Sequence, residues 1–221
     1  MNARRPILIL TLALLLFPLW LRAEGYTYDD GFEPKPPAPF PAEFKDYQIL
    51  PGSISPDGAC GLIYPKRSVV LDLDKPGLYL AQLKPFLILK EIPLTHDLES
   101  GAHGSYDVDW AKDSSLFLVT EGSKWGPDSV FLVTMNHGKV GSITNLITEI
   151  RKKLQSAYNK VKAKVERYND YYDYIFDSDN VEGWNIVNHN RQIDIWCICT
   201  TNPKPPRAGA WEADFAGLWD I

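Results

Sequence analysis

Short apolar runs that follow turn residues recur along the chain. The runs lie at 60–64, 116–120 and 193–197, and the turns before them at 54–58, 110–114 and 187–191. Runs that are short, β-branched or aromatic, and bounded by turn residues predict strands. In the first turn, Asp57-Gly58 suits a tight bend, because glycine tolerates positive φ and aspartate hydrogen-bonds to nearby backbone. The pattern therefore predicts a repeated β unit that begins three times.

A second strand is predicted in each unit. Apolar runs at 68–73 and 129–134 each begin with serine and lead to a glycine, at Gly77 and Gly138. In the third unit a proline-rich insertion precedes 218–221, which begins the corresponding strand. That unit stops partway, so we expect either a fragment or a last strand that something else completes.

A different periodicity separates the second unit from the third. From Ile143 to Tyr172, apolar residues recur at steps of three and four, which predicts an amphipathic helix inserted over about 143–175. Ser142 or Thr144 can cap its start. Lysine and arginine occupy much of the remaining helix surface, and we expect a solvated face there. A partner helix or contact with an anionic surface are the alternatives.

Together these elements predict a mainly β fold with one long inserted helix, in which antiparallel propeller-like blades form an incomplete or open arrangement. The units start at 54, 110 and 187. A propeller blade typically takes about 40–50 residues, so the first spacing is slightly long and the second is lengthened by the helix.

The unit resembles the blades of exported β-propellers of the TolB type, which open with Trp or Ile followed by Ser-Pro-Asp-Gly and continue into a hydrophobic strand. Residues 54–58 match this pattern fully, Trp110 and Asp113 match it in the second unit, and 187–191 match by position. The resemblance covers roughly residues 48–140 and 183–221. It implies blade structure and no particular function, because propellers host binding, scaffolding and catalysis.

The N-terminal segment has the pattern of a secretory signal. Arg4 and Arg5 form a positive start, 7–21 is almost wholly apolar, and Ala23 offers a small residue for cleavage. We therefore expect 1–23 to be a signal peptide and the protein to be exported, either to a periplasm or out of the cell. The alternative is an uncleaved N-terminal membrane anchor, for which the apolar run is short against the ~20 residues of a span.

Residues 24–47 contain five prolines between 34 and 41. Clustered prolines hold a chain extended and remove backbone donors, so this segment is predicted to be a tether. Phe40, Phe44 and Tyr47 are expected to hold its end against the propeller-like domain, which spans 48–221.

Composition narrows the function classes without choosing one. The net charge is −5, with 28 Asp and Glu against 23 Lys and Arg, which argues against general nucleic-acid binding. Cys60, Cys197 and Cys199 fall in predicted strands, either as small buried hydrophobes or, in an exported chain, as a disulfide between Cys60 and one of the other two. No second ligand pair stands at zinc-like spacing, so we predict no metal site and no cofactor.

One candidate site is the loop at 96–109. His103, Asp107 and Asp109 could form an acid–base or metal cluster there, which would make the protein a small exported hydrolase or a carbohydrate-binding protein. Such residues are more often polar groups of a loop or of a solvent-facing strand, and we expect Asp107 and Asp109 to be of that kind.

A second candidate site is aromatic. Trp211 and Trp219 belong to a cluster of tryptophans in the third unit, where they either pack in the core or form a binding surface. The expected function is a non-enzymatic interaction or structural module. Its partner would be another protein chain, or a second copy joined through the C-terminal strand edge. Membrane contact would come only through an uncleaved N-terminal segment, and no nucleic acid is expected.

Overall fold

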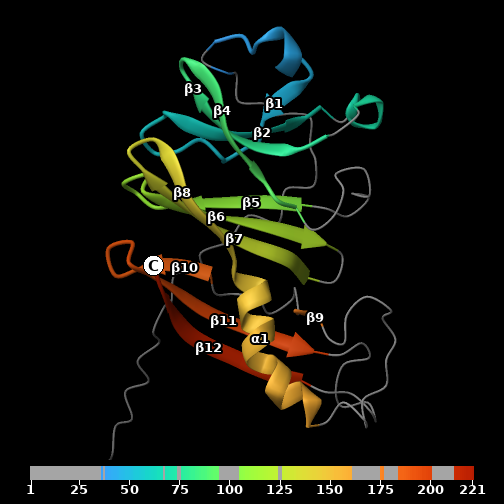
Figure 1. The fold of residues 1–221 in the computed structure, drawn as a ribbon, viewed down its shortest axis with the longest axis vertical. Helices are drawn as coiled ribbons and strands as arrows, with labels where there is room; N and C mark the ends of the chain where they lie inside the picture. Colours follow the sequence, from blue (N-terminus) through green and yellow to red (C-terminus); the bar gives the residue numbers. More distant parts are fainter. Residues whose placement is uncertain are drawn as a thin grey trace, which may run out of the picture.

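The computed structural model describes residues 36, 38–66, 68–73, 76–94, 105–123, 126–160, 175–176, 184–200 and 212–221. Within these ranges the chain forms three antiparallel sheets, none closed on itself, and one α-helix. The sheets follow one another along the long axis of the molecule, so that one lies between the other two (Figure 1). The predicted fold class, mainly β with antiparallel propeller-like blades in an open arrangement, is confirmed.

Each sheet is built from consecutive strands. Sheet A contains β1 (Tyr47–Ile49), β2 (Cys60–Pro65), β3 (Leu78–Leu83) and β4 (Phe86–Ile92), in that order. Sheet B contains β5 (Ser105–Trp110), β6 (Leu116–Ser123), β7 (Gly126–Asn136) and β8 (Lys139–Asn145). Sheet C contains β10 (Trp184–Val187), β11 (Gln192–Thr200) and β12 (Glu212–Asp220), and β9 (Ile175–Phe176) also pairs with β11. The helices are α1 (Leu146–Asn159) and the short 3-10 helices η1 (Ala42–Phe44) and η2 (Val70–Asp72).

The same hairpin opens all three sheets. In sheets A and B the strands on either side of the turn are joined by matching hydrogen bonds, from the N–H of Ser55 to the oxygen of Cys60 and from the N–H of Ala111 to the oxygen of Leu116, both 2.9 Å long. In sheet C, Val187 pairs with Gln192 in the same way. Each pair encloses four turn residues, and the third of them has positive φ: 72° at Gly58, 59° at Ser114 and 65° at Asn190. The turn of sheet C differs in that its first two residues, Asn188 and His189, also have positive φ.

This equivalence corrects the alignment of the third unit. Val187 corresponds to Ser55 and Ala111, so the unit opens at Ile186 and not at Val187 as predicted. The error has a physical origin. In β11 the buried apolar residues lie on the face toward sheet B, whereas Leu116 and Leu118 of β6 face away from sheet A. Matching apolar residues alone therefore displaced the alignment by one residue, which exchanges the two faces of a strand.

The turns of neighbouring sheets are also hydrogen-bonded to one another. The N–H of Asp57 donates to Ser114 Oγ over 3.2 Å, and the side chain of Asp113 hydrogen-bonds that of Asn190. The pKa of Asp57 is lowered, first by the hydrogen bond from the Ser55 hydroxyl and then by the N–H of Ala59. The pKa of Asp113 is lowered in the same manner, by the side chain and N–H of Ser115.

The predicted strand at 68–73 is wrong. The segment contains η2, closed by a hydrogen bond from the N–H of Asp72 to the oxygen of Val69 over 2.9 Å. The strand that corresponds to β7 is β3, because Gln82 pairs with Cys60 as Thr134 pairs with Leu116. Gly77 is buried next to the start of β3, whereas Gly138 does lie in a turn, with φ 74°. The prediction for 129–134 is confirmed, since these residues belong to β7.

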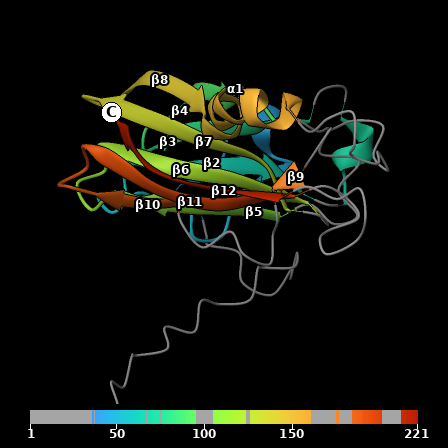
Figure 2. The same ribbon diagram turned by 90° about the horizontal axis from the view of Figure 1, so that it is seen from below.

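The inserted helix begins at Leu146 and not at Ile143. Ile143 still belongs to β8, where it pairs with Val133. The cap is Asn145, whose side-chain oxygen accepts from the N–H of Thr148 over 3.2 Å, and neither Ser142 nor Thr144 has this role. The second half of the predicted helix, residues 161–174, lies outside the described residues. Figure 2 shows α1 on the same side of the molecule as β8, opposite β5 and β10.

The central strands of sheet B, β6 and β7, are buried on both faces. Residues of β6 alternate between two cores: Phe117 and Val119 pack against sheet A, and Leu116 and Leu118 pack against sheet C and α1. Full burial of one such side chain contributes about 1.5–3 kcal/mol to the free energy of unfolding. These two cores hold the three sheets in series.

The outer face of sheet A is covered by the end of the predicted tether. Phe40 and Phe44 pack against the cluster that contains Ile63 and Leu83, and Tyr47 is buried within it. The Phe44 ring centroid lies 5.3 Å from that of Tyr47 and 5.4 Å from that of Phe86. The predicted docking of these aromatic residues on the domain is confirmed.

All three cysteines are free and buried. Cys60 lies in the core between sheets A and B, and Cys197 and Cys199 lie in the core between sheets B and C. Because sheet B separates the two cores, the alternative disulfide is wrong and the prediction of small buried hydrophobes is confirmed. The hydrogen bond with Cys197, followed by burial, raises the pKa of Cys199 well above its ordinary value.

Across the described ranges, no helix has the length and apolar character to cross a membrane. The predicted signal peptide, 1–23, lies outside these ranges.

Candidate interaction surface

Sheet C has one face that differs chemically from the corresponding faces of the other sheets. Leu62 of β2 and Leu118 of β6 occupy equivalent positions, each two residues after the hairpin pair, and both are buried against the next sheet. The equivalent residue of β11 is Asp194, which is exposed. The cross-strand partners of these three residues differ in the same way. Leu80 and Leu132 are buried, whereas Leu218, opposite Asp194, is 57% exposed. The outer face of sheet C therefore lacks the buried leucine pair that joins the other sheets.

Exposed apolar side chains gather on and beside this face. Trp196 is 39% exposed, and the residue opposite it is only an alanine, Ala216. Leu218 is also exposed, so two of the five large apolar side chains that are exposed in the described part of the chain lie on this face, and a third, Ile221, directly follows β12. We call Asp194, Trp196 and Leu218 the sheet C surface.

The surface adjoins an open strand edge. Among the described residues, β12 pairs only with β11, and it is the lowest strand of Figure 1, at one end of the molecule. The N–H of Ile221 donates to the oxygen of Arg191 over 3.0 Å. Because backbone groups alternate sides along an antiparallel strand, the N–H and C=O groups directed to the open edge are those of 212, 214, 216, 218 and 220. The side chains of these residues are exposed, and those between them are half-buried.

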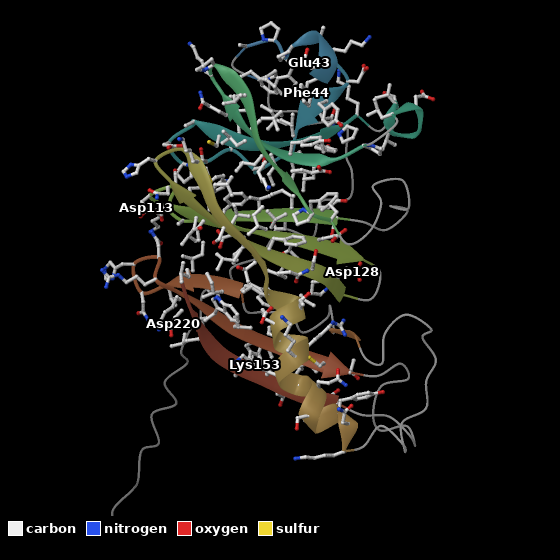
Figure 3. The ribbon with its side chains drawn as sticks, in the orientation of Figure 1. Glu43, Phe44, Asp113, Asp128, Lys153 and Asp220 are labelled. Carbon is white, nitrogen blue, oxygen red and sulfur yellow. The ribbon has the colours of Figure 1, made fainter. Side chains whose placement is uncertain are left out.

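Charge on the sheet is of one sign. The strands of sheet C contain four charged residues, all carboxylates and all exposed: Asp194, Glu212, Asp214 and Asp220. Figure 3 shows Asp220 at the sheet C end of the molecule, opposite the end that carries Phe44. Helix α1 crosses in front of β11 and β12 in Figure 3 and carries Lys153 and Lys152, of which Lys152 is paired with Glu149 at 2.5 Å.

Of the two tryptophans predicted as site residues, the one that the structure describes does not belong to the sheet C surface. Trp219 lies opposite Ile193 and packs, partly buried, against the core between sheets B and C. Trp211 is outside the described residues. Among the tryptophans that the structure describes, Trp196 is the exposed one, and it was not among the predicted site residues. The signal was the alternation in β11, where Asp194 and Trp196 lie on the face opposite Ile193 and Ile195.

The predicted acid–base cluster is described only in part. Asp107 and Asp109 are exposed residues of β5, at an edge of sheet B, and the N–H of Val108 donates to the Asp107 carboxylate over 2.9 Å. His103 lies outside the described residues. Within the described ranges, no three histidine, cysteine or acidic side chains come close enough to hold a metal ion.

A groove of about 1160 Å³ runs between the outer strands of sheets A and B, β4 and β8. Its walls mix apolar side chains such as Leu89 and Val140 with Lys90, Glu91 and Lys139. The charges are of both signs and come from neighbouring positions, so they define no single kind of ligand.

No protein-family model, no curated protein and no solved structure matches this chain. The resemblance to TolB-type propellers therefore stays a prediction.

Proposed function

We propose that this protein is an exported, non-enzymatic interaction module, which binds another polypeptide along the edge of β12 and the adjoining sheet C surface. The observation that carries the proposal is the combination of a strand edge that no described strand pairs with and the exposed Trp196 and Leu218 beside it. An edge strand presents a row of free N–H and C=O groups to which an extended peptide can add as a further strand. Side chains beside the edge then select the sequence of that peptide.

Sheets A and B support the proposal because their corresponding faces are already covered, unlike the sheet C surface. The outer face of sheet A is covered by Phe40 and Phe44 of the same chain, and the central strands of sheet B are buried on both faces. Large apolar side chains on an otherwise polar surface are typical of interaction sites.

Proline substitution at Ala216 provides the test. The N–H of Ala216 is directed to the open edge, so Ala216→Pro removes a donor from the binding edge and leaves the pairing with β11 intact. Ala216→Ser keeps the N–H and serves as the matched control. A displayed library of random ten-residue peptides is selected on the full-length protein and on both variants.

We expect peptides that are retained by the wild type and by Ala216→Ser and lost on Ala216→Pro. Circular dichroism and thermal unfolding confirm that the proline variant keeps its fold. A library that yields no peptide preferring the wild type over Ala216→Pro overturns the proposed function.

A further inference from the structure

We infer that the occupant of the β12 edge is a cationic extended segment of a different protein, in which lysine or arginine alternates with apolar residues. The inference rests on the proposed function and specifies the chemistry of its partner.

The charge of the edge supports this assignment. The five residues that direct backbone groups to the open edge are acidic, acidic, small, apolar and acidic in order: Glu212, Asp214, Ala216, Leu218 and Asp220. A residue added opposite each of them places its side chain on the same face of the sheet. Cations opposite the three carboxylates gain favourable cross-strand pairs, and the aliphatic stem of a lysine opposite Ala216 or Leu218 can pack on the surface formed by Trp196.

The other face of the added strand calls for apolar residues. Phe215 and Trp219 of β12 are partly buried and pack against the core between sheets B and C. Partner residues opposite the positions between the acidic ones would lie beside these two rings. The expected partner therefore has charge on one face and apolar side chains on the other, which is an alternating pattern along an extended chain.

A second copy of this protein is a poorer occupant. Antiparallel pairing of β12 with itself about Ala216 places Glu212 opposite Asp220 of the other copy, twice, and brings six carboxylates onto two adjacent strands. Like charges directly opposite one another destabilise strand pairs. The net charge of −5 on each copy acts in the same direction.

Three labelled peptides test the inference by fluorescence anisotropy with the full-length protein. The first is a ten-residue peptide in which lysine alternates with valine, and the other two replace every lysine with glutamine or with glutamate. We expect the lysine peptide to bind and the glutamine peptide to bind about tenfold more weakly, with no binding of the glutamate peptide. Raising the salt from about 0.1 M to about 1 M shortens the screening length from about 10 Å to about 3 Å and should remove this preference.

Variants locate the contact. Glu212→Gln and Asp214→Asn should each weaken binding of the lysine peptide about twofold to fivefold, and Ala216→Pro should abolish it. Asp107→Asn, which removes an exposed carboxylate from a strand of sheet B, should leave binding unchanged.

The remaining outcomes separate the two proposals. Peptides that all bind equally and are all lost on Ala216→Pro overturn the cationic partner and leave the proposed function standing. A lysine peptide that does not bind, or that binds equally well to Ala216→Pro, overturns the inference. Sedimentation that shows a wild-type dimer, lost in Ala216→Pro, assigns the edge to a second copy and also overturns it.

Discussion

The N–H of Asp57 donates to Ser114 Oγ over 3.2 Å, and this contact joins the opening turn of sheet A to that of sheet B. One sheet further on, Asp113 and Asn190 make the corresponding contact between sheets B and C. In both cases an aspartate at the second position of a turn meets the third residue of the next turn. The repetition indicates that the turns share one edge of the series and help to set the spacing between sheets.

Ser55 supports the first of these turns, and its removal is a direct test. The buried Ser55 hydroxyl donates to the Asp57 carboxylate over 2.6 Å and accepts from the N–H of Cys60 over 2.9 Å. Ser55→Ala should lower the free energy of unfolding by about 1–3 kcal/mol, because the buried Cys60 N–H loses an acceptor. Urea denaturation measures this loss.

The same variant makes a prediction about pH. The Ser55 hydrogen bond is the largest cause of the lowered pKa of Asp57, so this pKa should rise toward its ordinary value of 3.8 in Ser55→Ala. A group with a lowered folded-state pKa stabilises the fold above its unfolded value, and this contribution is lost as the pH falls through the folded value. The stability difference between wild type and variant should therefore narrow below pH 3.8. A difference that stays constant across that range contradicts the assigned role.

The sequence predicted the repeat and the fold class because both depend on local signals. Asp57-Gly58 and the apolar runs after each turn predict hairpins from the local sequence alone. The alignment of the third unit and the strand at 68–73 failed for a different reason. Which face of β11 is buried, and which segment pairs with β2, depend on neighbouring sheets and on the length of the connection, and neither is encoded in a short window.

Phe44 anchors the N-terminal segment, and its truncation should destabilise the whole domain. Its ring contacts the rings of Tyr47, Tyr79 and Phe86 on the outer face of sheet A. Because the side chain is only partly buried, Phe44→Ala should lower the free energy of unfolding by about 1–2 kcal/mol, less than for a fully buried ring. Glu43→Ala, at an exposed neighbour, should change it by less than about 0.5 kcal/mol. Equal effects of the two substitutions in urea denaturation contradict the anchoring role.

Tyr79 should make the domain sensitive to alkali. Burial, followed by the neighbouring Tyr47, raises the pKa of Tyr79 to about 12. A folded-state pKa above the unfolded value of 10.0 means that the stabilisation is complete below pH 10 and is lost as the pH rises toward about 12. Tyr79→Phe cannot ionise, so its melting temperature should fall less across this interval than that of the wild type. If the melting temperatures of the wild type and of Tyr79→Phe fall in parallel as the pH rises, ionisation of Tyr79 does not contribute to the loss of stability.

Export can be tested on the full-length chain. If 1–23 is a signal peptide, the protein recovered after secretion begins at Glu24, and N-terminal sequencing identifies that residue directly. Replacing Arg4 and Arg5 with glutamate should reduce export, because the positive start of the segment is lost. A protein that keeps Met1 and stays with the membrane fraction indicates an uncleaved anchor.

The candidate site was only partly accessible from the sequence. A binding surface in the third unit called for exposed tryptophans beside an open edge, but Trp219 packs against the core, which was the stated alternative. Trp211 lies outside the described residues. The exposed residue is Trp196, since its strand alternates between a buried and an open face. A tryptophan count cannot distinguish the two, because the distinction depends on which side of β11 is covered.

Asp194 is the residue that makes the outer face of sheet C unlike the faces that join the sheets, and its replacement should change how the molecules associate. Asp194→Leu restores the leucine found at the equivalent positions, Leu62 and Leu118, and places it beside the exposed Leu218. Because Asp194 is exposed, the free energy of unfolding should change by less than about 0.5 kcal/mol. The enlarged apolar patch should instead drive self-association, detected by sedimentation as species heavier than the wild type. Asp194→Asn removes the charge without adding apolar surface and should sediment like the wild type.

The reverse substitution, Leu118→Asp, buries an unpaired charge between sheets B and C and should unfold the domain. If Asp194→Leu destabilised the fold as severely as Leu118→Asp, the face of sheet C that carries Asp194 would be covered, and it could not serve as a binding surface.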